Sequence, residues 1–282
     1  MATVPFQRLL LASEHTEQDA GAEAVAFALA RHCGLGLAGV MPLTTNAEYE
    51  MVAPSIAAQA DARAKQSLAA LRAAAADSGV TLDLQVRRGP EPYQEIVAEA
   101  VARGADLIVI RRRGRKGLLA NLLVGEMVGK VVAHAPCNVL VVPRDARMWQ
   151  RRILIGVDPL APDRRAVEVA AVLAAACGLP LHVMCAAADA GVAQAEARSV
   201  LDAVLPPARA LHADTSGEVR VGRPHEALLR AAADTGADLI VVGRHGGSRR
   251  ARPWVGGTAQ KVMGLAASPL LVLGSGTDTV PR

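Results

Sequence analysis

Aromatic residues are nearly absent from this chain of 282 residues, which holds two Trp, two Tyr and two Phe although 51% of it is hydrophobic. Its core must therefore be built from Ala, Val and Leu, which suits helices packed closely on a parallel sheet. No segment approaches the roughly 18 to 20 uncharged apolar residues that a membrane span needs. The N-terminus has no apolar stretch before its first charges, unlike a signal peptide. We therefore expect a soluble cytoplasmic protein with no membrane contact.

Cysteine is also scarce, and none of the four cysteines has the spacing of a CxxC motif or a zinc finger. Cys33 and Cys177 each precede a glycine that we expect to end a helix. We interpret the cysteines as buried small apolar residues rather than metal or redox groups. The net charge of +4 permits an anionic ligand without requiring nucleic acid. The basic run 111–116 lacks interleaved aromatics, so we do not expect nucleic-acid binding.

The chain contains two copies of one unit. The segment that begins at Gly104 returns 132 residues later at Gly236, as GADLIVI and then GADLIVV. A basic turn containing glycine follows each copy, and an apolar strand closes each half, at 138–142 and 269–273. This repetition predicts two domains of the same fold.

Each half alternates expected strands and helices. Short connections between them predict a doubly wound parallel sheet in each half, so the fold class is α/β with two tandem Rossmann-like domains. We place the domains at residues 1–146 and 147–282, with the linker at 144–150. In the first half we expect strands at 9–12, 37–41, 82–86 and 106–110, helices at 19–33, 54–77 and 92–103, and a polar loop at 44–51. In the second half we expect strands at 152–158, 181–184 and 218–221, a first helix between 162 and 178, and a second helix interrupted at Pro206 and Pro207.

The closing strand of each half is apolar and is expected at a sheet edge. An exposed edge of this kind invites pairing with another strand. The two closing strands can pair with each other, which would make a pseudo-twofold dimer within one chain. A further dimer between chains remains open.

Glycines follow the fourth strand of the second half. Gly243 and Gly246 are separated by two residues, and after nine intervening residues Gly256 and Gly257 open a helix before Thr258. Ligands of such sheets bind beyond the carboxyl ends of the strands. Glycines there let the backbone approach a phosphate, and the helix N-terminus attracts anions. Nearby arginines add positive charge: Arg244, Arg249, Arg250 and Arg252. There is no GxxxxGK[ST] sequence, so this is not a P-loop.

This Gly-x2-Gly-x9-Gly spacing, between Ala-Asp-Leu-Ile-Val-Val and Thr-Ala-x-x-Val, resembles the nucleotide-binding signature of the universal stress protein family. The resemblance covers both halves and implies a tandem, adenine-nucleotide α-hydrolase-like fold. It implies ATP as ligand, with or without Mg²⁺. Gly257 departs from the Ser or Thr usual at that position, and Thr258 lies one place on. The resemblance implies these binding residues: Asp158, Val183, Gly243, His245, Gly246, Gly256, Gly257 and Thr258.

The first copy departs further from this signature. Arg111 stands where the first glycine belongs, Glu126 stands at the hydroxyl position, and the first strand ends in Glu14. A carboxylate about 4 Å from a phosphate would cost about 4 kcal/mol at an effective dielectric constant near 20. We expect Glu126 to pair with an arginine of the turn and to occupy the anion site itself. Nucleotide binding is therefore expected mainly in the second copy.

Three functions follow from these patterns. The first is a regulatory stress-response protein that binds an adenine nucleotide, has no catalytic residues or metal site, and at most hydrolyses ATP very weakly. The second is a scaffold of the same fold that binds an unknown protein partner without nucleotide. The third is an enzyme of the related α-hydrolase-like class, but the His-x-Gly-His and Ser-Gly-Gly-x-Asp-Ser sequences of such enzymes do not occur here.

Overall fold

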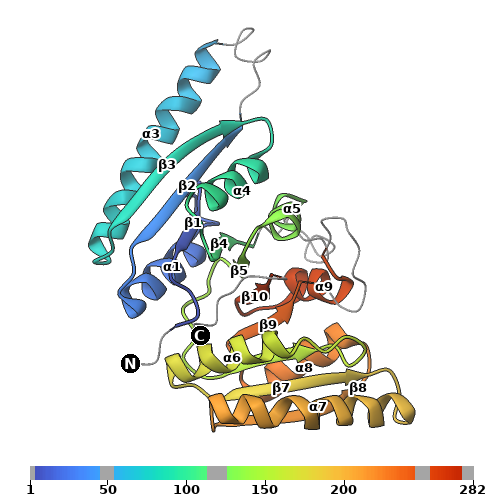
Figure 1. The fold of residues 1–282 in the computed structure, drawn as a ribbon. Coiled ribbons are helices and arrows are strands. Elements are labelled where there is room, and N and C mark those ends of the chain that lie inside the picture. The colour runs from blue at the N-terminus through green and yellow to red at the C-terminus, as the bar shows by residue number, and fades with distance from the viewer. Residues whose placement is uncertain (1–3, 45–53, 113–125, 245–254, 275–282) are drawn as a thin grey trace.

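The computed structural model describes residues 4–44, 54–112, 126–244 and 255–274. Within these ranges the strands form one ten-stranded sheet, which runs through both halves of the chain (Figure 1). Its order is β3-β2-β1-β4-β5-β10-β9-β6-β7-β8. The strand order of the second half is therefore the mirror image of the first, on either side of the central pair β5 and β10. The strands of the first half are β1 (Leu9–Ala12), β2 (Leu37–Thr44), β3 (Leu82–Gly89), β4 (Leu107–Arg111) and β5 (Asn138–Val142). Those of the second half are β6 (Ile153–Val157), β7 (Leu181–Ala187), β8 (Thr215–Val221), β9 (Leu239–Gly243) and β10 (Leu270–Leu273).

The two halves join through their closing strands. All pairings inside each half are parallel, whereas β5 and β10 pair antiparallel, with Leu140 opposite Leu271. The predicted α/β class and the predicted pairing of closing strands within one chain are both confirmed. The division at residue 146 stays a prediction.

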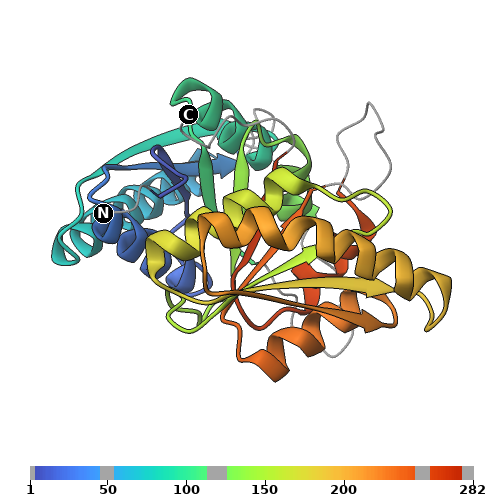
Figure 2. The ribbon, with the colours of Figure 1, turned by 60° about the horizontal axis from the view of Figure 1, so that its bottom comes forward.

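Helices cover both faces of the sheet. Strand side chains alternate between the faces: Leu9 and Leu11 pack beneath α1 and α3, whereas Leu10 packs beneath α4 and α5. In the second half α6 and α7 cover the first of these faces and α8 and α9 the other; Figure 2 shows α7 and α8 on opposite sides of β7 and β8. The helices are α1 (Ala20–Cys33), α3 (Pro54–Asp77), α4 (Pro92–Ala102), α5 (Glu126–His134), α6 (Arg164–Cys177), α7 (Val192–Leu211), α8 (Pro224–Thr235) and α9 (Gly257–Leu265).

Local signals in the sequence set the helix ends. Gly34 and Gly178 adopt φ of 64° and close α1 and α6 as left-handed C-caps. This conformation is strained for residues with a Cβ, which explains glycine at both positions. At the start of α6, Asp163 Oδ1 accepts a hydrogen bond from Ala166 N at 3.0 Å. The expected ends of both helices are confirmed to within a residue or two.

The expected interruption at Pro206 and Pro207 is wrong, because α7 continues through both prolines. Each proline removes one backbone hydrogen bond. Both lie on the exposed side of the helix, where water can bond the freed carbonyls. Leu205 and Ala208 are buried on the opposite side and hold the helix against the sheet. Strands β2, β3, β7 and β8 are also longer than predicted.

No helix in the described ranges is long and apolar enough to span a membrane. All four cysteines are free thiols; Cys137 and Cys185 are buried, and Cys33 and Cys177 are partly buried. Burial raises the pKa of Cys137 to about 12 and that of Cys185 to about 11. These thiols therefore stay protonated near neutral pH, in agreement with a packing role.

Candidate functional site

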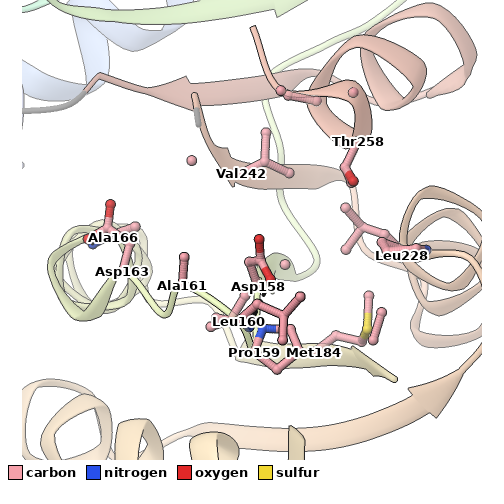
Figure 3. A pocket seen from close by; sticks show the side chains of 18 residues that line it. Asp158, Pro159, Leu160, Ala161, Asp163, Ala166, Met184, Leu228, Val242 and Thr258 are labelled. Carbon is pink, nitrogen blue, oxygen red and sulfur yellow. Dashed lines mark hydrogen bonds between the residues drawn. The ribbon is translucent and has the colours of Figure 1, made fainter. Parts of the chain in front are cut away.

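A pocket of about 350 Å³ lies in the second half, where β6, β7 and β9 end (Figure 3). Crossover helices leave the carboxyl edge of a parallel sheet open at this point, so the pocket stands where the sheet order predicts a ligand. In Figure 3, Met184 and Leu228 lie on one side of the space, and Asp163 and Ala166 lie on the other. The pocket is therefore bordered by strand ends, the loop 158–163 and the helices α6, α8 and α9.

One wall of the pocket is apolar. Met184 and Ala186 of β7 face it together with Leu228 of α8 and Val242 of β9. Because strand side chains alternate, Val183 points to the opposite face, where it is fully buried beneath α6 and α7. The structure thus places Val183 outside the lining and puts its neighbours there. Side-chain alternation along the strand could have indicated this, because the expected strand 181–184 already contained Met184 and stopped short only of Ala186.

Two aspartates shape the loop after β6. Asp158 Oδ1 accepts a hydrogen bond from Leu160 N at 3.0 Å, and Asp163 caps α6. This loop carries Leu160 at the pocket edge with 83% of its surface exposed. Both carboxylates therefore fix the backbone that borders the pocket, and both line it.

The glycine end of the pocket belongs to β9 and α9. Gly243, Gly256, Gly257 and Thr258 all line it, as the glycine spacing predicts. Gly256 is the N-cap of α9, and no side chain of the described residues caps the helix there. A Cβ added to Gly257 would meet nothing within 4 Å, so that position faces open space. The first N–H groups of α9 and its positive dipole end are arranged to attract an anion. His245 and Gly246 lie outside the described residues.

Arg244 does not add its charge to the pocket, contrary to expectation. Its guanidinium crosses into the first half, where Nη1 donates to Ala135 O at 2.8 Å and Nη2 donates to Cys137 O at 2.6 Å. Burial lowers its pKa. A buried guanidinium is stabilised by carbonyl acceptors, and the connection between α5 and β5 supplies two of them. The other three arginines of this turn lie outside the described residues.

Comparison with known proteins agrees with this architecture. The universal stress protein family matches residues 5–143 and 150–274. The chain belongs to this family. A universal stress protein of Synechocystis is 26% identical over 167 residues, which are 59% of this chain and 57% of that relative. The chain thus spans less than two thirds of that relative's length.

One solved structure supports the tandem fold. A crystal structure of a universal stress protein from Archaeoglobus fulgidus is similar over 95% of this chain and 98% of that chain, with a TM-score of 0.73 at 18% identity. A second solved structure is a universal stress protein in complex with cAMP. It covers 45% of this chain and 98% of its own, at 28% identity and a TM-score of 0.38.

The first half of this universal stress protein has almost no space at the corresponding position, where the cavity is about 10 Å³. Arg111 fills it, with 6% of its side chain exposed. Its Nη1 donates to Asp19 Oδ2 at 2.8 Å and to Thr16 Oγ1 at 2.7 Å, and its Nη2 donates to Glu14 Oε2 at 2.9 Å. Arg111 occupies the repeat position of Gly243, so a buried ion cluster replaces the open glycine end.

Glu126 does not occupy this site, which corrects our expectation. Its side chain is 83% exposed and pairs with Lys130, one helical turn further along α5, at 2.9 Å. Lys130 lowers the pKa of Glu126 through this bond. An exposed pair keeps both charges hydrated, whereas burying a further carboxylate beside Asp19 and Glu14 would have cost more. The sequence did not indicate that Asp19, 92 residues before Arg111, is its partner.

Proposed function

We propose that this universal stress protein binds an adenine nucleotide, ATP included, in the pocket of its second half and acts as a regulatory stress-response protein without strong catalysis. The observation that carries the proposal is a cavity of about 350 Å³ with an apolar wall and, at one end, a helix N-terminus whose cap residue is a glycine. A flat base suits the wall formed by Met184, Ala186, Leu228 and Val242. The phosphate suits the first N–H groups of α9. A relative in complex with cAMP agrees with this chemistry.

The side chains around the pocket support binding rather than catalysis. In the described lining the polar side chains are Asp158, Asp163 and Thr258. The two aspartates are bonded to backbone N–H groups and shape a loop. The described residues contain no cluster of three metal-ligating side chains. Any Mg²⁺ is therefore expected to enter with the phosphates of ATP, and Thr258 is the hydroxyl nearest to the usual position in the family signature.

A nucleotide-independent scaffold is the second candidate, and the first half favours it. Arg111 and its carboxylate partners close the equivalent site, leaving about 10 Å³. One half of the chain is thus expected to act through its surface alone. Both functions can coexist in one chain, with one nucleotide bound per molecule.

The first test is to denature the purified protein and to quantify any nucleotide that it releases. We expect about one adenine nucleotide per chain, or a rise in melting temperature when ATP and Mg²⁺ are added to ligand-free protein. If no nucleotide is released and the melting temperature does not change, the nucleotide-independent scaffold is the function.

A variant at Gly257 tests the location of the site. Gly257→Val places an isopropyl group at the glycine end of the pocket, at a position where an added Cβ meets nothing within 4 Å. We expect the affinity for ATP to fall at least about tenfold, while the free energy of unfolding changes by less than about 1 kcal/mol. Gly36→Val is the matched control, because a Cβ at this exposed glycine of the first half also meets nothing. Equal affinities of the two variants would exclude the proposed site.

A further inference from the structure

We propose that Arg112, a residue of the first half, is a positioning residue for the pocket of the second half. It acts through α9, whose C-terminal end it binds and whose N-terminal end walls the pocket. The inference rests on the proposed nucleotide binding, and it adds that binding in one half depends on the other half.

Arg112 follows β4 and is fixed at its backbone. Its N–H donates to Val142 O at 2.7 Å, which ties it to β5 of the same half. Its Nη1 then reaches across the join between the halves and donates to the carbonyl of Ala266. Burial lowers the pKa of this guanidinium, as it does for Arg244. A guanidinium that has lost its water of hydration depends on the hydrogen bond to this carbonyl.

Ala266 is the C-cap of α9, and its own N–H donates to Val262 O. The last carbonyls of a helix have no partner within the helix, and a cation there complements the negative end of the dipole. Arg112 supplies both effects from the opposite half. Because α9 has only nine residues, it is too short to be stable by itself and depends on such tertiary contacts.

The other end of α9 is also held by residues that bridge the halves. Gly256 N donates to Arg244 O at 2.9 Å, and Arg244 N donates to Leu273 O at 2.9 Å. The side chain of Arg244 binds Ala135 and Cys137 in the first half. The helix α9, which borders the glycine end of the pocket, is therefore hydrogen-bonded at both ends to residues that join the halves. A displacement of either half relative to the other moves this helix.

The experiment compares three variants of the full chain. Arg112→Ala removes the bond to Ala266, and Arg112→Lys keeps a cation that can rescue it. The matched control is Arg72→Ala, which removes a guanidinium bond of the same kind, to Leu84 O at 3.1 Å, inside the first half. The readouts are the ATP dissociation constant, measured with Mg²⁺ by calorimetry, and amide hydrogen exchange across residues 257–265 without ligand.

We expect Arg112→Ala to weaken ATP binding about fivefold or more, within the usual range of coupling between sites. The same variant should exchange faster in α9, whereas Arg112→Lys stays near the wild type in both readouts and Arg72→Ala changes neither. If Arg112→Ala binds ATP as tightly as Arg72→Ala does, the proposal is overturned.

The two proposals fail in different ways. A wild-type protein that binds no ATP refutes the proposed function, and hydrogen exchange alone then decides the role of Arg112. Unchanged protection of α9 in Arg112→Ala would overturn that role whatever the ligand.

Discussion

Replacement of Arg111 by Ala tests the buried ion cluster that closes the first half. Arg111 is 6% exposed and its partner Asp19 is 1% exposed, with 2.8 Å between Nη1 and Oδ2. Removing one member of a buried pair leaves the other charge unpaired, which costs about 3 to 5 kcal/mol. Asp19 keeps the hydrogen bonds from Thr16 N and Thr16 Oγ1, at 2.8 and 2.6 Å. These bonds offset part of the loss, so we expect about 3 kcal/mol.

The assay is urea unfolding followed by circular dichroism, with thermal unfolding as a second measure. A loss of about 3 kcal/mol corresponds to a fall of about 6 to 12 °C in melting temperature for a chain of this size. The control is Arg88→Ala, which breaks an ion pair with Asp61 at 2.8 Å. The side chains of Arg88 and Asp61 are 48% and 47% exposed. Such exposed ion pairs contribute about 1 kcal/mol or less to the free energy of unfolding.

A second variant separates the charge from the packing. Adding Asp19→Asn to Arg111→Ala removes the unpaired carboxylate and should recover part of the lost stability. If the free energies of unfolding of Arg111→Ala and Arg88→Ala differ by less than about 0.5 kcal/mol, the cluster does not stabilise the first half as argued. The explanation for its closed site would then fail as well.

Two further predictions concern the thiols and a helix cap. Burial raises the pKa of Cys137 to about 12, so the folded chain keeps a proton that the unfolded chain releases above its ordinary value of about 8.5. The contribution of this protonated thiol to the free energy of unfolding is complete below about pH 8.5. It is lost as the pH rises toward 12, by up to about 1.4 kcal/mol per pH unit. Urea unfolding from pH 8 to 10 should show a flatter decline for Cys137→Ala; parallel curves would contradict the shift. Asp163→Ala removes the N-cap of α6 and should cost about 1 kcal/mol, whereas Asp163→Asn should retain the bond and the stability in the same assay.

Local chemistry let the sequence predict most of the fold. Gly34 and Gly178 mark helix ends because a left-handed residue is cheap only for glycine. The repeat that begins at Gly104 and Gly236 shows that the halves share a fold, and the apolar closing strands indicate their pairing. The glycine end of the pocket also follows from sequence, since glycines after a strand and at the start of a helix let the backbone approach an anionic ligand closely. The glycine signals lie within a few residues of the features that they predict.

Only the tertiary structure decided which partners the charged and packed side chains take. Arg111 and Asp19 are 92 residues apart, and Arg112 bonds a carbonyl 154 residues away. No local pattern fixes such choices, because the cost of burying a guanidinium depends on every carbonyl and carboxylate that folding brings near it. The path of α7 through its prolines was settled in the same way, by burial on its far side. The sequence determined that the chain holds two copies of one fold whose glycine turns differ, whereas long-range burial of charge decided that Arg111, and not Glu126, closes the first site.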